Sequence, residues 1–289
     1  MRIRVSKKGI LTLLLRHLMA GLEEKDLWEN PKNISRNLLL RWGWRKGRKD
    51  ILIIVPVFNE ANNILEVIDN IIRNVSQADF LVVDDGSTDK TRKVLEKHNV
   101  PYLFHAANLG YGAAVQTGLK YAVSKGYPVI SLMDGDGQHH SKELLPMIEK
   151  MKKENLDLII GSRFMTFWKT VYSVPLPRKL GMIFFSIIAS ILTNTKIKDT
   201  SSGFQVFNLR TAALLQKIYP SDFPDAEIII LLNLLSFKTK EIPVKMIARE
   251  KGKSMITFFR SLYYPFMMFV SIMVVLIKVF ILKHQVKNV

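Results

Sequence analysis

Residues 51–85, ILIIVPVFNEANNILEVIDNIIRNVSQADFLVVDD, contain two apolar runs separated by a segment of helical periodicity. Both runs are continuous in Ile, Leu and Val rather than alternating with polar residues, which is typical of strands covered on both faces of a sheet. The segment between them spaces its apolar residues along one helical face: Ile64, Val67, Ile68, Ile71 and Ile72. The stretch therefore predicts a strand, a helix and a second strand of a layered α/β fold.

The same alternation continues through three more apolar runs, YLFH, VISLMD and LDLIIG, with helical segments between them (residues 102–161). This pattern predicts parallel α/β layering. Beyond residue 165 we expect strands at GFQVFN and KTKEIPVKMI and a helix at DAEIIILLNLLS. The apolar segment 180–192 is too short to span a bilayer and has two interpretations, a core helix or a helix in a membrane interface.

Composition restricts the class of protein. The chain has 289 residues and is 48% hydrophobic, which is ample for a folded core. Its formal net charge of +17 indicates an anionic partner, such as nucleic acid, acidic lipid or a phosphorylated substrate. Because the chain contains no cysteine, a disulfide framework and a thiolate zinc site are both excluded.

The two ends of the chain differ from its middle. Residues 1–50 form a basic extension, which either lies on an anionic membrane or is a solvated arm. Residues 262–282 are apolar except for Lys278, and as a helix they would be about 31 Å long, enough to cross a bilayer. The alternative for this run is a buried core or oligomer helix. We expect domains at 1–50, 51–260 and 261–289.

Polar motifs follow the predicted strands. Ligands of open α/β sheets bind at the carboxyl ends of the strands, where NE (59–60), DDGS (84–87) and DGDGQ (134–138) all fall. In DDGS the carboxylates can accept hydrogen bonds from a nucleobase or a ribose. The alternative is a strand-to-helix turn in which Ser87 or Thr88 caps the next helix.

Asp134, Asp136 and Gln138 stand on alternate positions between glycines that let the backbone turn. Oxygen ligands of this kind suit Mg²⁺ or Mn²⁺, which proteins commonly hold through one or two carboxylates together with substrate phosphates. A solvated turn is the alternative. The adjacent residues His139 and His140 lack the spacing of zinc ligands.

Eight motifs in order resemble the glycosyltransferase family 2 pattern, most of all its polyprenyl-phosphate sugar transferase branch, which includes dolichol-phosphate mannose synthases. They are VPVFNE, VVDDGSTDKT, NLGYGAAVQTG, MDGDGQHH, GSRF, DTSSGFQVF, FPDAE and EIPVKMIAREKGKS. The resemblance covers about residues 51–260. It implies a GT-A-type, Rossmann-like mixed sheet flanked by helices, followed by C-terminal membrane-associated helices.

The resemblance also implies roles for individual residues. Donor-binding positions are Pro56, Asn59, Glu60, Asp84, Asp85, Asp134, Arg249 and Lys253. The metal ligands are Asp134, Asp136 and Gln138, and the catalytic positions are Asp136, Arg163, Arg178 and Asp225. Arg163 and Arg178 match arginines that face the lipid phosphate.

The implied activity is the inverting, metal-dependent transfer of a hexose from a nucleotide-diphosphate sugar to a polyprenyl phosphate. This activity implies that the chain is at the cell membrane, with its catalytic domain in the cytoplasm. The sequence leaves both a monomer and a homo-oligomer as alternatives. The alternative acceptor is a sugar hydroxyl, with Asp225 or Glu227 as general base. These two acids also suit the N-terminus of a helix without any catalytic role.

Readings from other classes are less consistent with the sequence. A nucleotidyltransferase that makes sugar nucleotides would not need the apolar run at residues 262–282. A membrane scaffold would not need acids at successive strand ends. No zinc-finger, RNA-recognition or homeodomain signature is present, so we expect no specific nucleic-acid partner.

Overall fold

The computed structural model describes residues 49–163, 176–199, 202–220, 225–246, 270 and 272–280. Its elements are, in order, β1 (Ile51–Val57), α3 (Ile64–Asn74), β2 (Ala78–Asp84), α4 (Thr91–Lys97), β3 (Tyr102–Phe104), α5 (Tyr111–Lys125), β4 (Val129–Leu132), η2 (Ser141–Glu143), α6 (Leu144–Glu154), β5 (Leu158–Ser162), α7 (Leu176–Thr193), β6 (Gln205–Asn208), α8 (Leu209–Ile218), α9 (Asp225–Leu234) and β7 (Thr239–Pro243). The strands predicted from residues 51–161 and the later strands and helix all form. Helix α8 was not predicted.

Seven strands form one sheet in the order β3-β2-β1-β4-β6-β5-β7. The pairs β1 with β2, β1 with β4, β2 with β3 and β5 with β7 are parallel, whereas β6 is antiparallel to both β4 and β5. The sheet is therefore mixed, as the family resemblance implied, and the parallel pattern expected from periodicity is interrupted only at β6 among these strands.

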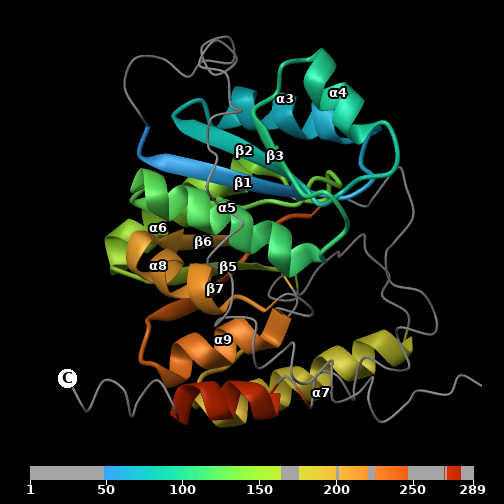
Figure 1. The fold of residues 1–289 in the computed structure, drawn as a ribbon. Helices are drawn as coiled ribbons and strands as arrows, with labels where there is room; N and C mark the ends of the chain where they lie inside the picture. The colour runs from blue at the N-terminus through green and yellow to red at the C-terminus, as the bar shows by residue number, and fades with distance from the viewer. Residues whose placement is uncertain are drawn as a thin grey trace, which may run out of the picture.

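Helices cover both faces of the sheet (Figure 1). Successive residues of β1 point to opposite faces, so Leu52 and Ile54 join one core cluster while Ile53 and Val55 join the other. The first cluster includes side chains of α5, α7, α8 and α9, and the second includes side chains of α3, α4 and α6. Burial on both faces explains why these strands are continuously apolar.

The C-terminal apolar run is described at residues 270 and 272–280, which are helical. Ile272, Val275 and Val279 of this segment are buried in the first core cluster. Within the described ranges, no helix combines the length and the apolar character that crossing a bilayer requires. The N-terminal extension, residues 1–48, lies outside the described part, and the expected domain boundaries stay a prediction.

Candidate active site

The carboxyl ends of β1 and β2 are joined through Asn59. Its backbone has a positive φ of 59°, a conformation that asparagine tolerates better than most residues. The Asn59 Oδ1 atom accepts hydrogen bonds from the backbone N–H groups of Thr88 and Asp89 at 2.8 and 3.1 Å, and its own N–H donates to Ser87 Oγ at 2.9 Å. Asn59 thus fixes the turn that follows β2.

Two other predicted donor-binding residues lie along the same edge. Pro56 is opposite Val83 in the pairing of β1 with β2. Glu60 is buried, its carboxylate accepts from Asn63 Nδ2 at 2.6 Å, and its backbone N–H donates to Thr91 Oγ1 at 2.9 Å. The structure therefore brings the first and second predicted donor motifs together.

Asp85 is committed to internal hydrogen bonds. Its carboxylate accepts from the backbone N–H groups of Leu109 and Gly110, at 3.0 and 2.8 Å, and lies 2.7 Å from His105 Nδ1. The other ring nitrogen, Nε2, is 2.9 Å from Thr117 Oγ1. The two ring nitrogens of His105 therefore link the Asp85 carboxylate to the Thr117 hydroxyl. Asp85 therefore orders the loop that leads into α5.

The neighbouring Asp84 is also buried, and its Oδ1 accepts from the Ser87 N–H at 3.1 Å. The alternative interpretation of this motif, a helix cap at Ser87 or Thr88, is not what the structure has. Asp89 Oδ1 instead accepts from the Thr91 N–H at 2.8 Å, at the first residue of α4. Ser87 and Thr88 thus bond to Asn59 rather than capping the helix.

Asp134, after β4, is held by two neighbours. The Tyr111 hydroxyl donates to its Oδ1 at 3.0 Å, and the Asp134 backbone N–H donates to His139 Nδ1 at 2.9 Å. The proton of the neutral His139 ring is then on Nε2, which lies 3.6 Å from Asp134 Oδ2. A Cβ atom at Gly203 would come within 2.8 Å of Asp134 Oδ2, so only glycine leaves the carboxylate in place.

The ionisation of this pair is set by burial. Burial raises the pKa of Asp134, opposed by the Tyr111 hydrogen bond and the positive charge of Arg163. Burial also lowers the pKa of His139 to about 4, and its ring stacks on Phe204 with centroids 4.9 Å apart. His139 is therefore neutral at pH 7, and it acts as a fixed hydrogen-bonding group.

The other two predicted metal ligands lie in the following turn. Gly137 has a φ of +80°, and the Gln138 N–H donates to Asp136 Oδ1 at 3.0 Å. The side chain of Asp134 is 30% exposed, and Asp136 and Gln138 are half-buried.

The carboxylate and amide oxygens of these residues are ligands that a divalent cation such as Mg²⁺ prefers. A cation would offset the cost of burying the Asp134 charge. In the described part of the chain, no group of three or more His, Asp or Glu side chains is arranged to hold a metal. The remaining coordination positions would thus fall to substrate phosphates or water, as is common for Mg²⁺.

Arg163, after β5, is fixed by a buried carboxylate. Its Nε and Nη2 atoms donate to the two oxygens of Asp199 at 2.8 and 2.7 Å, and its backbone N–H donates to the same side chain at 2.9 Å. The Asp199 side chain is fully buried, and that of Arg163 is 15% exposed. This forked pair gives the guanidinium one orientation beside Asp134.

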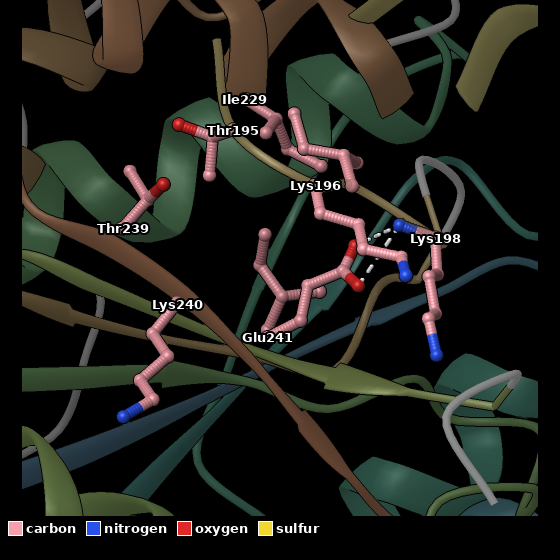
Figure 2. A pocket seen from close by; sticks show the side chains of 9 residues that line it. Thr195, Lys196, Lys198, Ile229, Thr239, Lys240 and Glu241 are labelled. Atoms are coloured by element: carbon pink, nitrogen blue, oxygen red, sulfur yellow. Dashed lines mark hydrogen bonds between the residues drawn. The ribbon is translucent and has the colours of Figure 1, made fainter. Parts of the chain in front are cut away.

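Asp199 is positioned in turn by Glu241 of β7. The Glu241 carboxylate accepts from the backbone N–H groups of Lys198 and Asp199, at 3.0 and 2.9 Å. Figure 2 shows this contact at the side of a pocket of about 270 Å³ that Thr195, Lys196 and Lys198 also line. Burial raises the pKa of Glu241. Among its described lining residues, this pocket has none of the predicted site residues.

Four predicted site residues are not described at the level of side chains. Arg178 lies in the first turn of α7 and Asp225 is the first residue of α9, but only their backbones are described. Arg249 and Lys253 lie outside the described residues. The alternative base Glu227 is 1% exposed, and Lys278 Nζ contacts its Oε1 at 2.9 Å. Glu227 is therefore committed to an ion pair.

Reasoning from the sequence did not single out four residues that organise the site. They are Tyr111, His139, Asp199 and Glu241. All four lie inside motifs that carry the family resemblance, but the residues they contact are far away in sequence or follow a turn. The motifs could therefore have marked these four residues as members of the site. No pattern in the sequence indicates which residues they contact.

Comparisons with known proteins agree with this arrangement. Residues 52–213 match "Glycosyl transferase family 2". A UDP-N-acetylglucosamine--dolichyl-phosphate N-acetylglucosaminyltransferase of Methanococcus voltae is 26% identical over 238 residues, covering 74% of this chain and 94% of the relative. An undecaprenyl-phosphate mannosyltransferase of Micrococcus luteus is 27% identical over 212 residues, covering 71% and 86%.

A similar fold is found in the mannosyltransferase PcManGT from Pyrobaculum calidifontis, solved in complex with GDP-Man and Mn²⁺. It is 16% identical, with a TM-score of 0.50, over 86% of this chain and 70% of that one. The mixed sheet, its acidic edge and these relatives define a glycosyltransferase. More narrowly, the chain belongs to glycosyl transferase family 2.

The buried neutral state of His139 predicts a loss of stability in acid. Its pKa is about 4 when folded and near 6.5 when unfolded, so the unfolded chain binds more protons between these values. In metal-free buffer, this effect should remove about 2 kcal/mol of unfolding free energy between pH 7.5 and pH 5.

The variant His139→Asn, which keeps an acceptor for the Asp134 N–H, should lose this contribution in denaturant titrations. The control His140→Asn should keep the wild-type dependence. Equal pH dependence in all three proteins would contradict the burial argument.

The ion pair of Arg163 with Asp199 predicts a large cost of removing the carboxylate. Asp199→Ala should lower the free energy of unfolding by about 3 kcal/mol or more, because it leaves a mostly buried guanidinium without this partner. Asp69→Ala breaks the exposed pair with Arg73 and should cost less than about 1 kcal/mol. Urea titrations at pH 7 would measure both changes in the free energy of unfolding. Similar losses of unfolding free energy in the two variants would show that burial of the Arg163–Asp199 pair does not increase the cost of removing its carboxylate.

Proposed function

We propose that this glycosyltransferase moves a hexose from a nucleotide-diphosphate sugar to a polyprenyl phosphate, either undecaprenyl or dolichyl phosphate, at the cytoplasmic face of the cell membrane. The observation that carries the proposal is the fixed guanidinium of Arg163 beside the acidic end of β4. A cation held in one orientation next to a predicted metal site suits an acceptor that is itself an anion. Two relatives that are named for transfer to dolichyl and undecaprenyl phosphate support the same acceptor class.

The donor would lie along the edge formed by β1, β2 and β4. Pro56, Asn59, Glu60 and Asp84 line the part of this edge assigned to the nucleotide, and Asp85 keeps the neighbouring loop in place. Oxygen acceptors are suited to the N–H and O–H groups of a base and a ribose. The predicted contacts of Arg249 and Lys253 with phosphate belong to the same proposal.

Asp134, Asp136 and Gln138 would hold Mg²⁺ or Mn²⁺. When bound, such an ion neutralises negative charge on a departing diphosphate. Tyr111 contributes by donating to one carboxylate oxygen of Asp134, and His139 contributes by accepting the Asp134 backbone N–H, so the carboxylate needs little reorganisation. Neutral His139 adds no positive charge that would compete with a cation for Asp134.

Transfer would then need no strong general base on the protein. A phosphate monoester has its second pKa near about 6 and is largely a dianion at neutral pH. One of its oxygens forms a bond to the anomeric carbon while the bond from that carbon to the nucleotide diphosphate breaks. Arg163, whose Nε and Nη2 atoms already bind Asp199, would orient the attacking phosphate together with the predicted Arg178. The alternative acceptor, a sugar hydroxyl, requires a base, and Asp225 is the candidate for that role because Glu227 is held by Lys278.

The proposed activity is tested by incubating the protein with Mg²⁺ or Mn²⁺, polyprenyl phosphate and a panel of sugar nucleotides, followed by mass spectrometry of the lipid fraction. Transfer should stop on chelation of the metal and return on its addition. Asp136→Asn should lower the rate by about 100-fold or more, because it removes one of two carboxylates from the metal site. Asp69→Asn, on an exposed helix face, is the matched control. Unchanged transfer with chelator would rule out metal dependence, and no lipid product with any donor would overturn the acceptor.

A single displacement predicts the stereochemistry of the product. With an α-linked donor the lipid sugar should be β-linked, because the phosphate attacks opposite to the departing diphosphate. The one-bond coupling constant between the anomeric carbon and its proton, in the NMR spectrum of the purified lipid, distinguishes the two anomers. An α-linked product would contradict inversion and would require a covalent intermediate or another mechanism.

A further inference from the structure

Helix α7 has one buried and one exposed apolar face. Phe185 and Ala189 are in the first core cluster, whereas large apolar side chains are exposed on other sides of the helix. The exposed residues are Ile183, Phe184, Ile187 and Ile191, and Ile191 is 74% exposed. Their spacing of three and four residues makes them one stripe along the helix. Scattered apolar residues are normal on a protein surface, but a continuous stripe marks a contact surface.

Residues 272–280 repeat the same division. Ile272, Val275 and Val279 are buried in the first core cluster, and the opposite side of this segment is exposed. The exposed residues are Met273, Leu276, Ile277 and Phe280, and Phe280 is 64% exposed. Both helical segments are thus packed on the protein along one side and apolar on the other.

Helix α7 and residues 272–280 both contact helix α9. Helix α7 packs against α9, and Lys278 forms its ion pair with Glu227 of α9. Figure 1 draws α7, α9 and residues 272–280 at the same end of the molecule. Lys278 is the one charged residue of the run 262–282, and it is only 17% exposed. The ion pair therefore turns this charge toward the protein.

The flanks of both segments are basic in sequence. Residues 176–198 contain four Lys and Arg residues and residues 251–289 contain six, and neither range contains an Asp or a Glu. Cations that surround an apolar surface complement a membrane that carries anionic lipids, whereas they would repel one another across the interface of a symmetric dimer. The charge pattern favours a lipid surface over a second copy of the chain.

We propose that these two stripes form one apolar face, made of Ile183, Phe184, Ile187, Ile191, Met273, Leu276, Ile277 and Phe280, which lies in the interface of one leaflet of an anionic membrane. Both helical segments then run along the membrane plane, since their other sides are held by the core and by the pair of Glu227 with Lys278. Helices of this kind enter a membrane to a depth of about 5–10 Å.

This inference rests on the proposed lipid acceptor for its functional meaning, because the apolar face would hold the chain at the surface where the phosphate of that acceptor lies. The chain leaves α7 at Thr193 and reaches Asp199, the partner of Arg163, within a short segment. Ser186 and Ser190 of α7 donate hydrogen bonds to the Ile197 carbonyl of that segment. The apolar face is thus tied through the protein to the guanidinium proposed to bind the acceptor phosphate.

Vesicle binding tests the apolar face without any donor or acceptor. The full chain should sediment with vesicles that contain phosphatidylglycerol, and it should bind pure phosphatidylcholine vesicles at least about tenfold more weakly. The double variant Ile187→Asp with Phe280→Asp should reduce binding to the anionic vesicles at least about tenfold. Ile72→Asp, an exposed isoleucine of α3, is the matched control and should bind as the wild type does.

Two outcomes would overturn the proposal. One is equal vesicle binding by the wild type and the double variant, which would show that other residues bind the lipid. The other is a wild-type chain that does not bind vesicles. This outcome overturns the proposal whether sedimentation velocity shows a monomer or a self-associated chain. Circular dichroism of all variants distinguishes a lost surface from a lost fold.

Spin labels test the orientation. The chain has no cysteine, so a single introduced cysteine carries the only label. Labels in Ile187→Cys, Met273→Cys and Phe280→Cys should be immersed to similar, shallow depths, measured by the accessibility of the label to oxygen and to a nickel chelate. Positions 273 and 280 are about 10 Å apart along a helix, so a segment that crosses the bilayer would give clearly different depths. Ile72→Cys should stay in water.

The two proposals fail in different ways. A chain that binds vesicles but transfers no sugar to any lipid phosphate would refute the proposed function and leave the apolar face intact. A chain that glycosylates a short, water-soluble prenyl phosphate but ignores vesicles would do the reverse. The double variant should retain transfer to the soluble acceptor and lose transfer to an acceptor embedded in vesicles.

Discussion

The reversed direction of β6 is the constraint on which the site depends. Because β6 runs antiparallel between β4 and β5, the residues that precede it lie at the edge where those two strands end. Asp199 thereby reaches Arg163, and Gly203 and Phe204 reach Asp134 and His139. A parallel strand at this place would have its preceding loop at the opposite edge, and neither Asp134 nor Arg163 would have these partners.

Sequence patterns were sufficient for elements whose signal is local. The strands and helices of residues 51–162 alternate in periodicity, and each is long enough to show its own pattern. The direction of β6 is a different kind of property, because a short strand has the same pattern in either direction. Helix α8 follows β6 without an intervening loop, and its moderate apolar periodicity (Ala212, Leu215) gave no separate signal.

The residues of the site also differ in whether a local sequence pattern could predict them. Residues whose chemistry is visible in a short motif, such as Asp84, Asp134 and Asp136, could be predicted, and the structure puts the first two at the carboxyl ends of β2 and β4, on either side of β1. Residues that act through distant partners could not. Tyr111 contacts a carboxylate on another element, and Glu241 acts on the backbone of Lys198 and Asp199 rather than on a side chain. Such contacts depend on how the strands are ordered in space, and no spacing along the chain encodes that order.

The commitment of Asp85 to the loop before α5 has a thermodynamic consequence. A carboxylate that already gathers two amide groups and an imidazole leaves this loop with few alternative conformations. A ligand arriving at the edge therefore meets a surface that is rigid in advance, and its association loses less entropy than folding a disordered loop around it would require. The saving in entropy originates in one aspartate whose carboxylate is bound to its own backbone amides before any ligand arrives.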